Sequence, residues 1–283
     1  FEFFKYNSLL FLKNIEKTEI TLNSTTITEV IKNKINDSQF KSTLKSNNEV
    51  SNWLISYENT TAIAFSLLNN EIVKISKEES LVHAFLPTED INGLGVLING
   101  NFSTDPSRRH LIFESETKES IKQSSFQIVK LIKECINNED KDSIGIINSL
   151  VPYSDPRMLQ FAKNSFTKFL LDEMKLVDIE FFRQMKLPPS WLNHNDYLKL
   201  IPNTSNSLDN KHYSIDGFIS LLKFLGASEN NFDEIKNTIN LADISVLGCV
   251  QITQYLFKSI LTFSNAKDSE ILNLKILFSG GTR

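Results

Sequence analysis

The sequence is poor in cysteine, glycine and proline, and it has no long hydrophobic segment. Of its 283 residues only 2 are Cys, 9 are Gly and 7 are Pro. Cys135 and Cys249 belong to no CxxC pair or Cys/His cluster, which argues against a disulfide framework or a structural zinc site. No apolar run reaches the roughly 18 residues that a membrane-spanning helix needs. Since no signal-peptide pattern is present either, we expect a cytoplasmic location and no membrane partner.

Basic residues are not in excess. The chain has 30 Lys and Arg against 34 Asp and Glu, which gives a net charge of -4. This balance argues against a general nucleic-acid binder, although it is compatible with a local basic patch. The 4 histidines are scattered along the chain, so they predict no metal centre. The abundant residue is Phe, with 21 copies, which we expect to build the core.

Hydrophobic periodicity divides the chain into a strand-rich part and a helical part. A short helix over residues 6–15 precedes segments whose alternation predicts strands. These segments are 18–22, 26–35, 50–57, 72–75, 82–86 and 95–99, with 61–68 predicted as a strand or a short helix. Helical spacing then predicts helices over 117–136, 143–150, 156–174, 215–225, 231–240 and 243–263. The Phe161 and Phe166 side chains are expected to share the buried side of the third of these helices.

This order of elements predicts an α+β (α/β) chain. The sequence Leu187-Pro-Pro-Ser and the polar stretch 203–214 are the best candidates for a boundary. We therefore expect an α/β domain over residues 1–186 and a mainly helical region over 187–283.

One segment carries candidate chemistry. Phe85-Leu-Pro-Thr88 is followed by Ile98-Asn-Gly-Asn-Phe102 and then by Ser107-Arg-Arg109. A guanidinium is a permanent cation with a rigid fork of donors that suits phosphate oxygens. An arginine on a loop can therefore be presented to a phosphoryl group held by another domain. A solvated pair or a structural ion pair is the other interpretation of Arg108 and Arg109.

These segments, together with Leu9-Leu-Phe-Leu-Lys-Asn-Ile15, resemble in order and spacing the sacsin-type Hsp90-like ATPases of the GHKL class. The resemblance covers about residues 6–175. In that family the ATP pocket lies in an N-terminal GHKL domain with an Asp-x-Gly-x-Gly motif and a Gly-rich lid. The nearest string here, Asp90-Ile-Asn-Gly-Leu-Gly95, has an extra residue before its first glycine and is expected to be a loop. The chain starts with Phe1 instead of Met, and we expect it to be a fragment or a processed chain.

The resemblance implies an N-terminal mixed β-sheet with helices, similar to an Hsp90 middle domain. It implies that Arg108 or Arg109 contacts the γ-phosphate, and the sequence leaves open which of them does so. Asn99 and Asn101 flank the preceding turn and are expected to orient the loop. ATP and Mg²⁺ would be bound by the upstream domain, with no cofactor held by this chain alone.

The implied partners are the protein's own GHKL domain, client or effector proteins, and a second copy of the chain. The implied role is chaperone-like or in antiviral defence, and the richness in Asn, Lys and Ile favours a bacterial source. The alternative is a non-catalytic module whose arginines bind an acidic protein or nucleic-acid phosphates. A free-standing hydrolase has no support, because Ser103, Thr104 and Ser107 have no His/Asp partners at a recognised spacing.

Overall fold

A computed structural model describes residues 6–12, 17–22, 25–46, 49–137, 142–159, 165–201, 208, 210–239 and 244–262. The chain forms two compact units. Unit 1 comprises Phe1–Ile179 and Ile215–Leu225, and unit 2 comprises Glu180–Ser214 and Gly226–Arg283. The boundary expected at residue 187 therefore lies within unit 2, and a later helical segment returns to unit 1.

The strands of unit 1 form one mixed sheet of nine strands. They are β1 (Lys17–Leu22), β2 (Thr25–Lys34), β3 (Gln39–Ser46), β4 (Glu49–Glu58), β5 (Thr61–Leu68), β6 (Glu71–Val73), β7 (Leu81–Ala84), β8 (Leu86–Ile91) and β9 (Leu97–Asn99). Strands β1 to β5 are antiparallel neighbours in chain order. Strand β9 pairs antiparallel with β5 and parallel with β7, and β8 forms the edge beyond β7.

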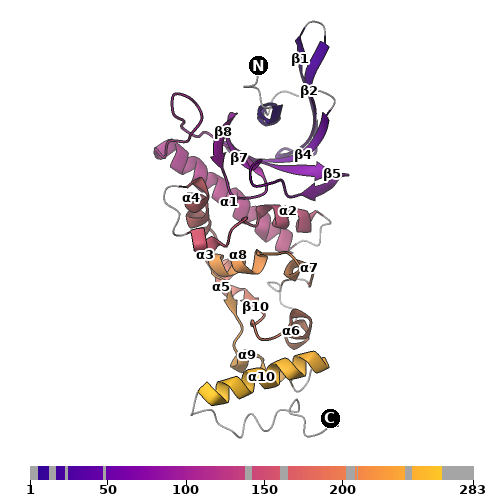
Figure 1. The fold of residues 1–283 in the computed structure, drawn as a ribbon, viewed down its shortest axis with the longest axis vertical. Coiled ribbons are helices and arrows are strands. Elements are labelled where there is room, and N and C mark those ends of the chain that lie inside the picture. The colour runs from indigo at the N-terminus through magenta and orange to yellow at the C-terminus, as the bar shows by residue number, and fades with distance from the viewer. Residues whose placement is uncertain are drawn as a thin grey trace. The chain divides into compact units, whose positions relative to one another are not determined.

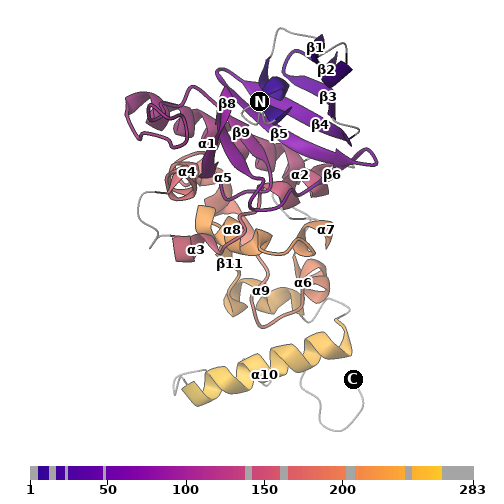
Figure 2. The same cartoon turned by 45° about the horizontal axis from the view of Figure 1, so that its top comes forward.

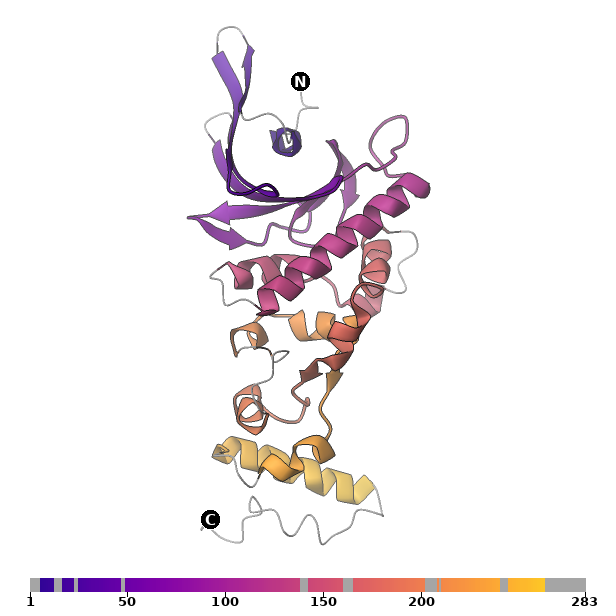
Figure 3. The same ribbon diagram turned by 180° about the vertical axis from the view of Figure 1, so that it is seen from behind.

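The two faces of the sheet are covered by different elements. The sheet curves around the short 3₁₀-helix η1 (Tyr6–Phe11), and α1 (Ser115–Asn137) crosses the opposite face (Figures 1 and 3). Leu10 and Phe11 of η1 are buried among side chains of the curved face, and α2 (Ser143–Leu150) packs beside α1. The strands and helices of unit 1 therefore share cores on both faces of the sheet.

Unit 1 is completed by α3 (Pro156–Leu159), α4 (Phe166–Met174) and α8 (Phe218–Leu225). The predicted single helix over 156–174 is wrong, because α4 has its own N-cap. Ser165 has extended backbone angles, φ -99° and ψ 143°, and its hydroxyl accepts a hydrogen bond from the Lys168 N–H. Phe161, predicted on this helix, lies outside the described residues.

The other elements are short except for the last. They are α5 (Ile179–Gln184), β10 (Lys186–Leu187), α6 (His194–Leu200), α7 (Asn210–Tyr213), β11 (Ser228–Glu229), α9 (Phe232–Ile239) and α10 (Val246–Thr262). Strands β10 and β11 pair in parallel. The core of unit 2 is built around Tyr197 of α6, Ile235 of α9 and Ile252 of α10. Figure 2 labels these three helices.

The predicted α+β class, with an N-terminal mixed sheet followed by helices, is confirmed. Segment 61–68, left open between strand and helix, is strand β5. Over the described residues, no helix has both the length and the apolar character to cross a bilayer.

Candidate functional site

The two candidate arginines lie on a loop that is closed at its base. Thr104 and Leu111 form an isolated antiparallel bridge. Inside this bridge, the Asp105 N–H donates to the His110 carbonyl at 2.9 Å. We call residues 105–110 the arginine loop. Its closed base makes it a compact hairpin-like projection between β9 and α1.

The carboxylate of Asp105 organises the arginine loop from within. Its Oδ1 accepts the backbone N–H of Arg109 at 2.9 Å and that of His110 at 3.3 Å. Its Oδ2 accepts the Ser107 hydroxyl at 2.7 Å. The bond from Ser107, followed by the backbone N–H groups of His110 and Arg109, lowers the pKa of Asp105 below its ordinary value. The ionised form of Asp105 is therefore the one that holds the loop.

Strand β8 anchors the arginine loop from outside. The Glu89 N–H donates to the Arg109 carbonyl at 2.7 Å, and the Leu111 N–H donates to Asp90 Oδ2 at 2.6 Å. Asp90, the first residue of the string that is nearest to a nucleotide-binding motif, is thus a support for the loop. The backbone of the loop is therefore held by Asp105 from within the loop and by strand β8 from outside it.

The two arginines differ in their surroundings. The Nε of Arg109 lies 3.5 Å from Glu89 Oε1, and His110 lies 3.8 Å from Glu89 Oε2 and 3.6 Å from Asp90 Oδ1. Arg108 is exposed at the tip of the loop, with a left-handed φ of 57°. Within the part of the chain that the structure describes, its guanidinium has no hydrogen-bond or ion-pair partner. The Arg109 side chain therefore lies beside a carboxylate of the neighbouring strand, whereas the Arg108 guanidinium is exposed and can bind an anion.

Asn99 and Asn101 make their contacts with the scaffold of the loop. The buried Asn99 side chain accepts the Phe85 N–H at 3.1 Å, at the turn between β7 and β8 where Phe85 has a φ of 63°. The Asn101 carbonyl accepts the Ser120 hydroxyl of α1 at 2.9 Å, and its side chain is exposed. Asn99 thus fixes the hairpin that carries Glu89, while Asn101 ties the end of β9 to α1.

Residues 92–96 form a packed loop, whereas Asp90 and Ile91, which were predicted to belong to the same loop, are the last residues of β8. The Asn92 side chain accepts the Leu94 N–H at 2.8 Å and donates to the Val96 carbonyl at 2.8 Å. Gly93 has a φ of 81°, and a Cβ added there would collide with the Thr167 side chain of α4. Gly93 and Leu94 are buried, so this loop is packed into unit 1.

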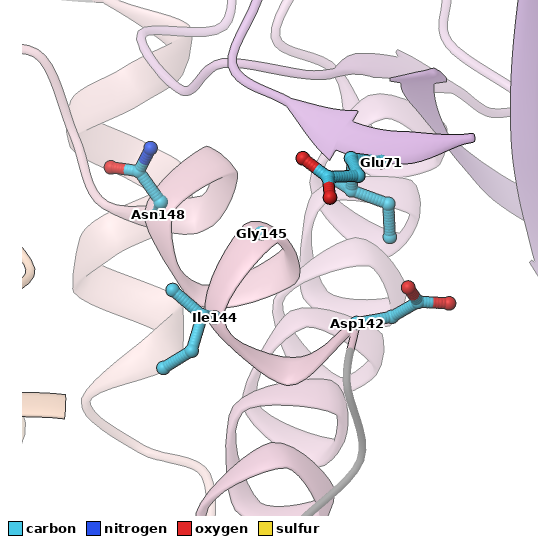
Figure 4. A pocket seen from close by; sticks show the side chains of 6 residues that line it. Glu71, Asp142, Ile144, Gly145 and Asn148 are labelled. Carbon is cyan, nitrogen blue, oxygen red and sulfur yellow. The ribbon is translucent and has the colours of Figure 1, made fainter. Parts of the chain in front are cut away.

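A pocket of about 290 Å³ lies elsewhere in unit 1, between β6 and α2. Its lining residues are Glu71, Ile72, Asp142, Ile144, Gly145 and Asn148 (Figure 4). No residue of the arginine loop lines it. Two carboxylates do not by themselves define a ligand site, and the described residues contain no group of three or more His, Cys, Asp or Glu side chains placed to hold a metal ion.

Sequence reasoning missed the residues that position the arginines. Asp105 could have been found, because Asp-Pro-Ser at 105–107 is a turn sequence in which the Asp side chain bonds backbone N–H groups ahead of it. Glu89 and Asp90 carried no comparable signal, since their contact with the loop depends on the fold.

An exposed guanidinium on a fixed loop can bind phosphate or carboxylate oxygens in a defined direction. Comparison of the chain with protein-family models, curated proteins and solved structures finds no match.

Proposed function

We propose that the chain is the middle-domain-like part of a sacsin-like, Hsp90-like ATPase, and that its arginine loop contacts the γ-phosphate of ATP bound by an upstream GHKL domain. The observation that carries this proposal is the state of Arg108. Its guanidinium is exposed and without a partner among the described residues, on a loop whose backbone is fixed by Asp105. The order of motifs that resembles this family supports the same function.

The chemical role of Arg108 in this proposal is electrostatic. As the γ-phosphoryl group is transferred, negative charge develops on its oxygens, and a guanidinium that is already in position stabilises that charge. Fixing the loop in advance lowers the entropy cost of placing the side chain. Arginines in this role increase the rate of GTP hydrolysis by factors of about 10³–10⁵.

Arg109 has a supporting role in the proposal. Its carbonyl accepts the Glu89 N–H, and its side chain faces the Glu89 carboxylate. Both contacts hold the loop on the edge strand β8. Replacing the Arg109 side chain removes only its contact with the Glu89 carboxylate and should loosen the loop slightly, whereas replacing Arg108 should remove the phosphate contact itself.

The string nearest to a nucleotide-binding motif, Asp90-Ile-Asn-Gly-Leu-Gly95, has other roles in this fold. Asp90 supports the arginine loop, and the following glycines form a packed loop. In the proposal, the upstream domain binds ATP and Mg²⁺, and this chain supplies the arginine. The intact protein would act in the cytoplasm in a chaperone-like or antiviral role, on client or effector proteins, and in assembly with a second copy.

ATP turnover of the protein that includes its upstream sequence tests this proposal. We expect Arg108→Ala to lower turnover by a factor of about 10³ while nucleotide binding is retained. We expect Arg109→Ala to have a smaller effect, because it acts through loop order. Unchanged turnover in Arg108→Ala would exclude the proposed role.

A second candidate function is favoured by the two adjacent exposed arginines, Arg108 and Arg109. In this alternative, the loop binds the phosphates of a nucleic acid or an acidic protein without catalysis. Arg108→Ala would then weaken that binding, and the loss would be larger at low salt. ATP turnover would stay unchanged, so the same variant separates the two functions.

A further inference from the structure

The curved face of the unit 1 sheet holds the short helix η1 through side chains. Leu10 and Phe11 of η1 are buried there in one apolar cluster with Trp53 of β4, and Figure 3 shows η1 inside the curve of the sheet. Within the described part of the chain, no backbone N–H to carbonyl bond joins η1 to a strand. The helix therefore fills an apolar groove without taking part in the hydrogen-bond ladder of the sheet.

Two side chains of the sheet bind the backbone of this segment. The Tyr57 hydroxyl donates to the Leu10 carbonyl at 3.3 Å, and Lys32 Nζ donates to the Leu12 carbonyl at 2.5 Å. Donors that are directed at two backbone carbonyls recognise a peptide, whereas a hydrocarbon chain has no such acceptors. The groove thus has the chemistry to bind a peptide with large apolar side chains.

The ammonium group of Lys32 is a buried cation without a counter-ion. The residue is 7% exposed, and its bond to Leu12 is to a neutral carbonyl. Among the residues that the structure describes, no carboxylate lies within ion-pair distance of its Nζ. Buried charges in proteins are normally paired with an opposite charge. The end of the groove therefore lacks an anion.

A second donor lies beside Lys32. Ser42 of β3 is directly opposite Lys32 in the β2–β3 register, and such pairs have Cβ atoms about 4.5–5.5 Å apart. Ser42 is 2% exposed, and its hydroxyl has no hydrogen-bond partner among the described residues. It lies on the same face of β3 as Leu44, which packs in the cluster around η1. A buried hydroxyl and a buried ammonium group thus lack an acceptor at the same place.

We propose that this groove binds the carboxyl-terminal end of a partner protein. In the complex, two large apolar side chains of the partner take the places of Leu10 and Phe11, and the terminal carboxylate accepts hydrogen bonds from Lys32 and Ser42. Helix η1 is then an internal occupant that the partner displaces, with the Leu12 carbonyl in the position of the carboxylate. A carboxylate has the charge and the two oxygen atoms that these donors require. Capture of a terminal carboxylate is an established mode of peptide recognition.

This inference is independent of the ATPase proposal, because no residue of the arginine loop takes part. It also gives the charge of Lys32 a role, since an amine that is buried beside a neutral carbonyl is costly for folding. The weak attachment of η1 to the sheet is what makes its exchange feasible. A partner would replace contacts between side chains and leave the strand pairing of the sheet intact.

Peptide binding to the full chain tests the proposal. The probe is a peptide of residues 5–12, Lys-Tyr-Asn-Ser-Leu-Leu-Phe-Leu, with a fluorescent label at its N-terminus and either a free carboxylate or an amide at its C-terminus. Fluorescence anisotropy should show the free acid binding at least tenfold more tightly than the amide, because only the acid pairs with Lys32. Phe11→Ala weakens the internal occupant, so both peptides should bind this variant severalfold more tightly than the unmodified chain.

Substitutions at the end of the groove identify the site. Lys32→Met should abolish the preference for the acid, and Ser42→Ala should reduce it severalfold. Lys41→Met, at the exposed position next to Ser42, is the matched control and should keep the preference. Equal binding of acid and amide, or a preference that Lys32→Met leaves intact, would overturn the proposal.

Two further outcomes would also overturn it. The first is the absence of any binding of the acid peptide to the unmodified chain, a result that does not depend on the folding of a variant. The second concerns decanoate, which has a carboxylate and an apolar chain but no backbone carbonyls. If decanoate displaces the labelled peptide as well as unlabelled acid peptide does, the groove binds fatty acids and not peptides.

Discussion

The Ser107 hydroxyl donates a 2.7 Å hydrogen bond to Asp105 Oδ2 and is the largest cause of the lowered pKa of that carboxyl. The other oxygen of Asp105 accepts the backbone N–H groups of Arg109 and His110. One ionised side chain therefore links the start of the loop to the backbone of Arg109 and His110. We expect the presentation of Arg108 to depend on this carboxylate, although the Arg108 N–H bonds the backbone carbonyl of Asp105 and not its side chain.

The order of the arginine loop should depend on pH. Because the folded state lowers the pKa of Asp105 below its ordinary 3.8, the stabilising contribution is fully present above that value. It is lost as the pH falls through the lower, folded-state pKa. We expect the amide protons of Arg109 and His110 to exchange faster relative to the rest of unit 1 in acid, as measured by NMR.

The variant Ser107→Ala tests whether the Ser107 hydroxyl lowers the pKa of Asp105. Without the hydroxyl, the pKa of Asp105 should rise toward its ordinary value, so the loop should loosen at a higher pH than in the unmodified protein. The chemical shift of the Asp105 carboxyl carbon reports this titration directly. An unchanged titration midpoint in Ser107→Ala would contradict the role given to the hydroxyl.

The elements that periodicity predicted are those with one buried face. Helix α1 follows its apolar spacing, with Ile121, Ile128 and Ile132 buried. Strand β3 was missed because Ser42, which lies between Phe40 and Leu44 on the inward face, is polar, so that Leu44 is the only buried apolar side chain of the strand. A pattern of apolar residues cannot reveal a strand whose inward side chains are partly polar.

The candidate site could be found from the sequence only at the level of the arginine pair. Distinguishing Arg108 from Arg109 requires Glu89, which lies on another strand and becomes a neighbour only through the fold. A similar limit applies to Asn99, which was expected to orient the arginine loop, whereas its side chain bonds the Phe85 N–H. Local sequence predicts turns, but ion pairs between distant strands depend on the topology of the sheet.

Gly248 in α10 should not tolerate a side chain. A Cβ at this position would lie 2.6 Å from Ile244 Cγ2 and 2.7 Å from Asp196 Cγ. We expect Gly248→Ala to lower the free energy of unfolding by about 2 kcal/mol, since overpacking outweighs the better helix propensity of alanine. Urea unfolding followed by the fluorescence of Trp191, which stacks on Tyr255 of α10, measures this loss. Gln254→Ala, at an exposed position of α10, is the control and should have little effect.

The buried carboxylate of Asp196 bonds Ser245, the residue that precedes α10. Its side chain is 1% exposed, and it accepts the Ser245 N–H at 2.8 Å together with the Ser245 hydroxyl. Burial would raise its pKa, but the bonds from Ser245, Asn193 and Lys199 outweigh burial and lower the pKa to about 2. Ser245 in turn accepts the Gly248 N–H at 3.1 Å and so caps the helix.

Removing the Asp196 carboxylate should destabilise unit 2. We expect Asp196→Ala to cost about 2 kcal/mol, because it removes the charged acceptor of the Ser245 N–H and hydroxyl. In the unmodified protein this stabilisation is complete above the ordinary pKa of 3.8 and is lost as the pH falls through about 2. The difference in urea midpoint between the two proteins should therefore shrink in strong acid. A difference that does not vary with pH would show that the charge of Asp196 contributes nothing.

Lys32 on β2 should make unit 1 less stable at neutral pH than in mild base. Its side chain is 7% exposed, its Nζ donates to the Leu12 carbonyl at 2.5 Å, and burial lowers its pKa from 10.5 to about 8. Between these two values the unfolded chain keeps a proton that the folded chain has lost, so the free energy of unfolding rises with pH.

The variant Lys32→Met tests this argument, because it keeps the packing of the aliphatic part of the side chain and removes the buried charge. We expect this variant to be more stable by about 1 kcal/mol at pH 7, with the loss of the Leu12 bond offsetting part of the gain. Its advantage should vanish as the pH rises from 8 toward 10.5, whereas Lys41→Met, at an exposed position of β3, should show no such trend. If Lys32→Met is instead less stable at every pH, the bond to Leu12 outweighs the cost of burying the amine.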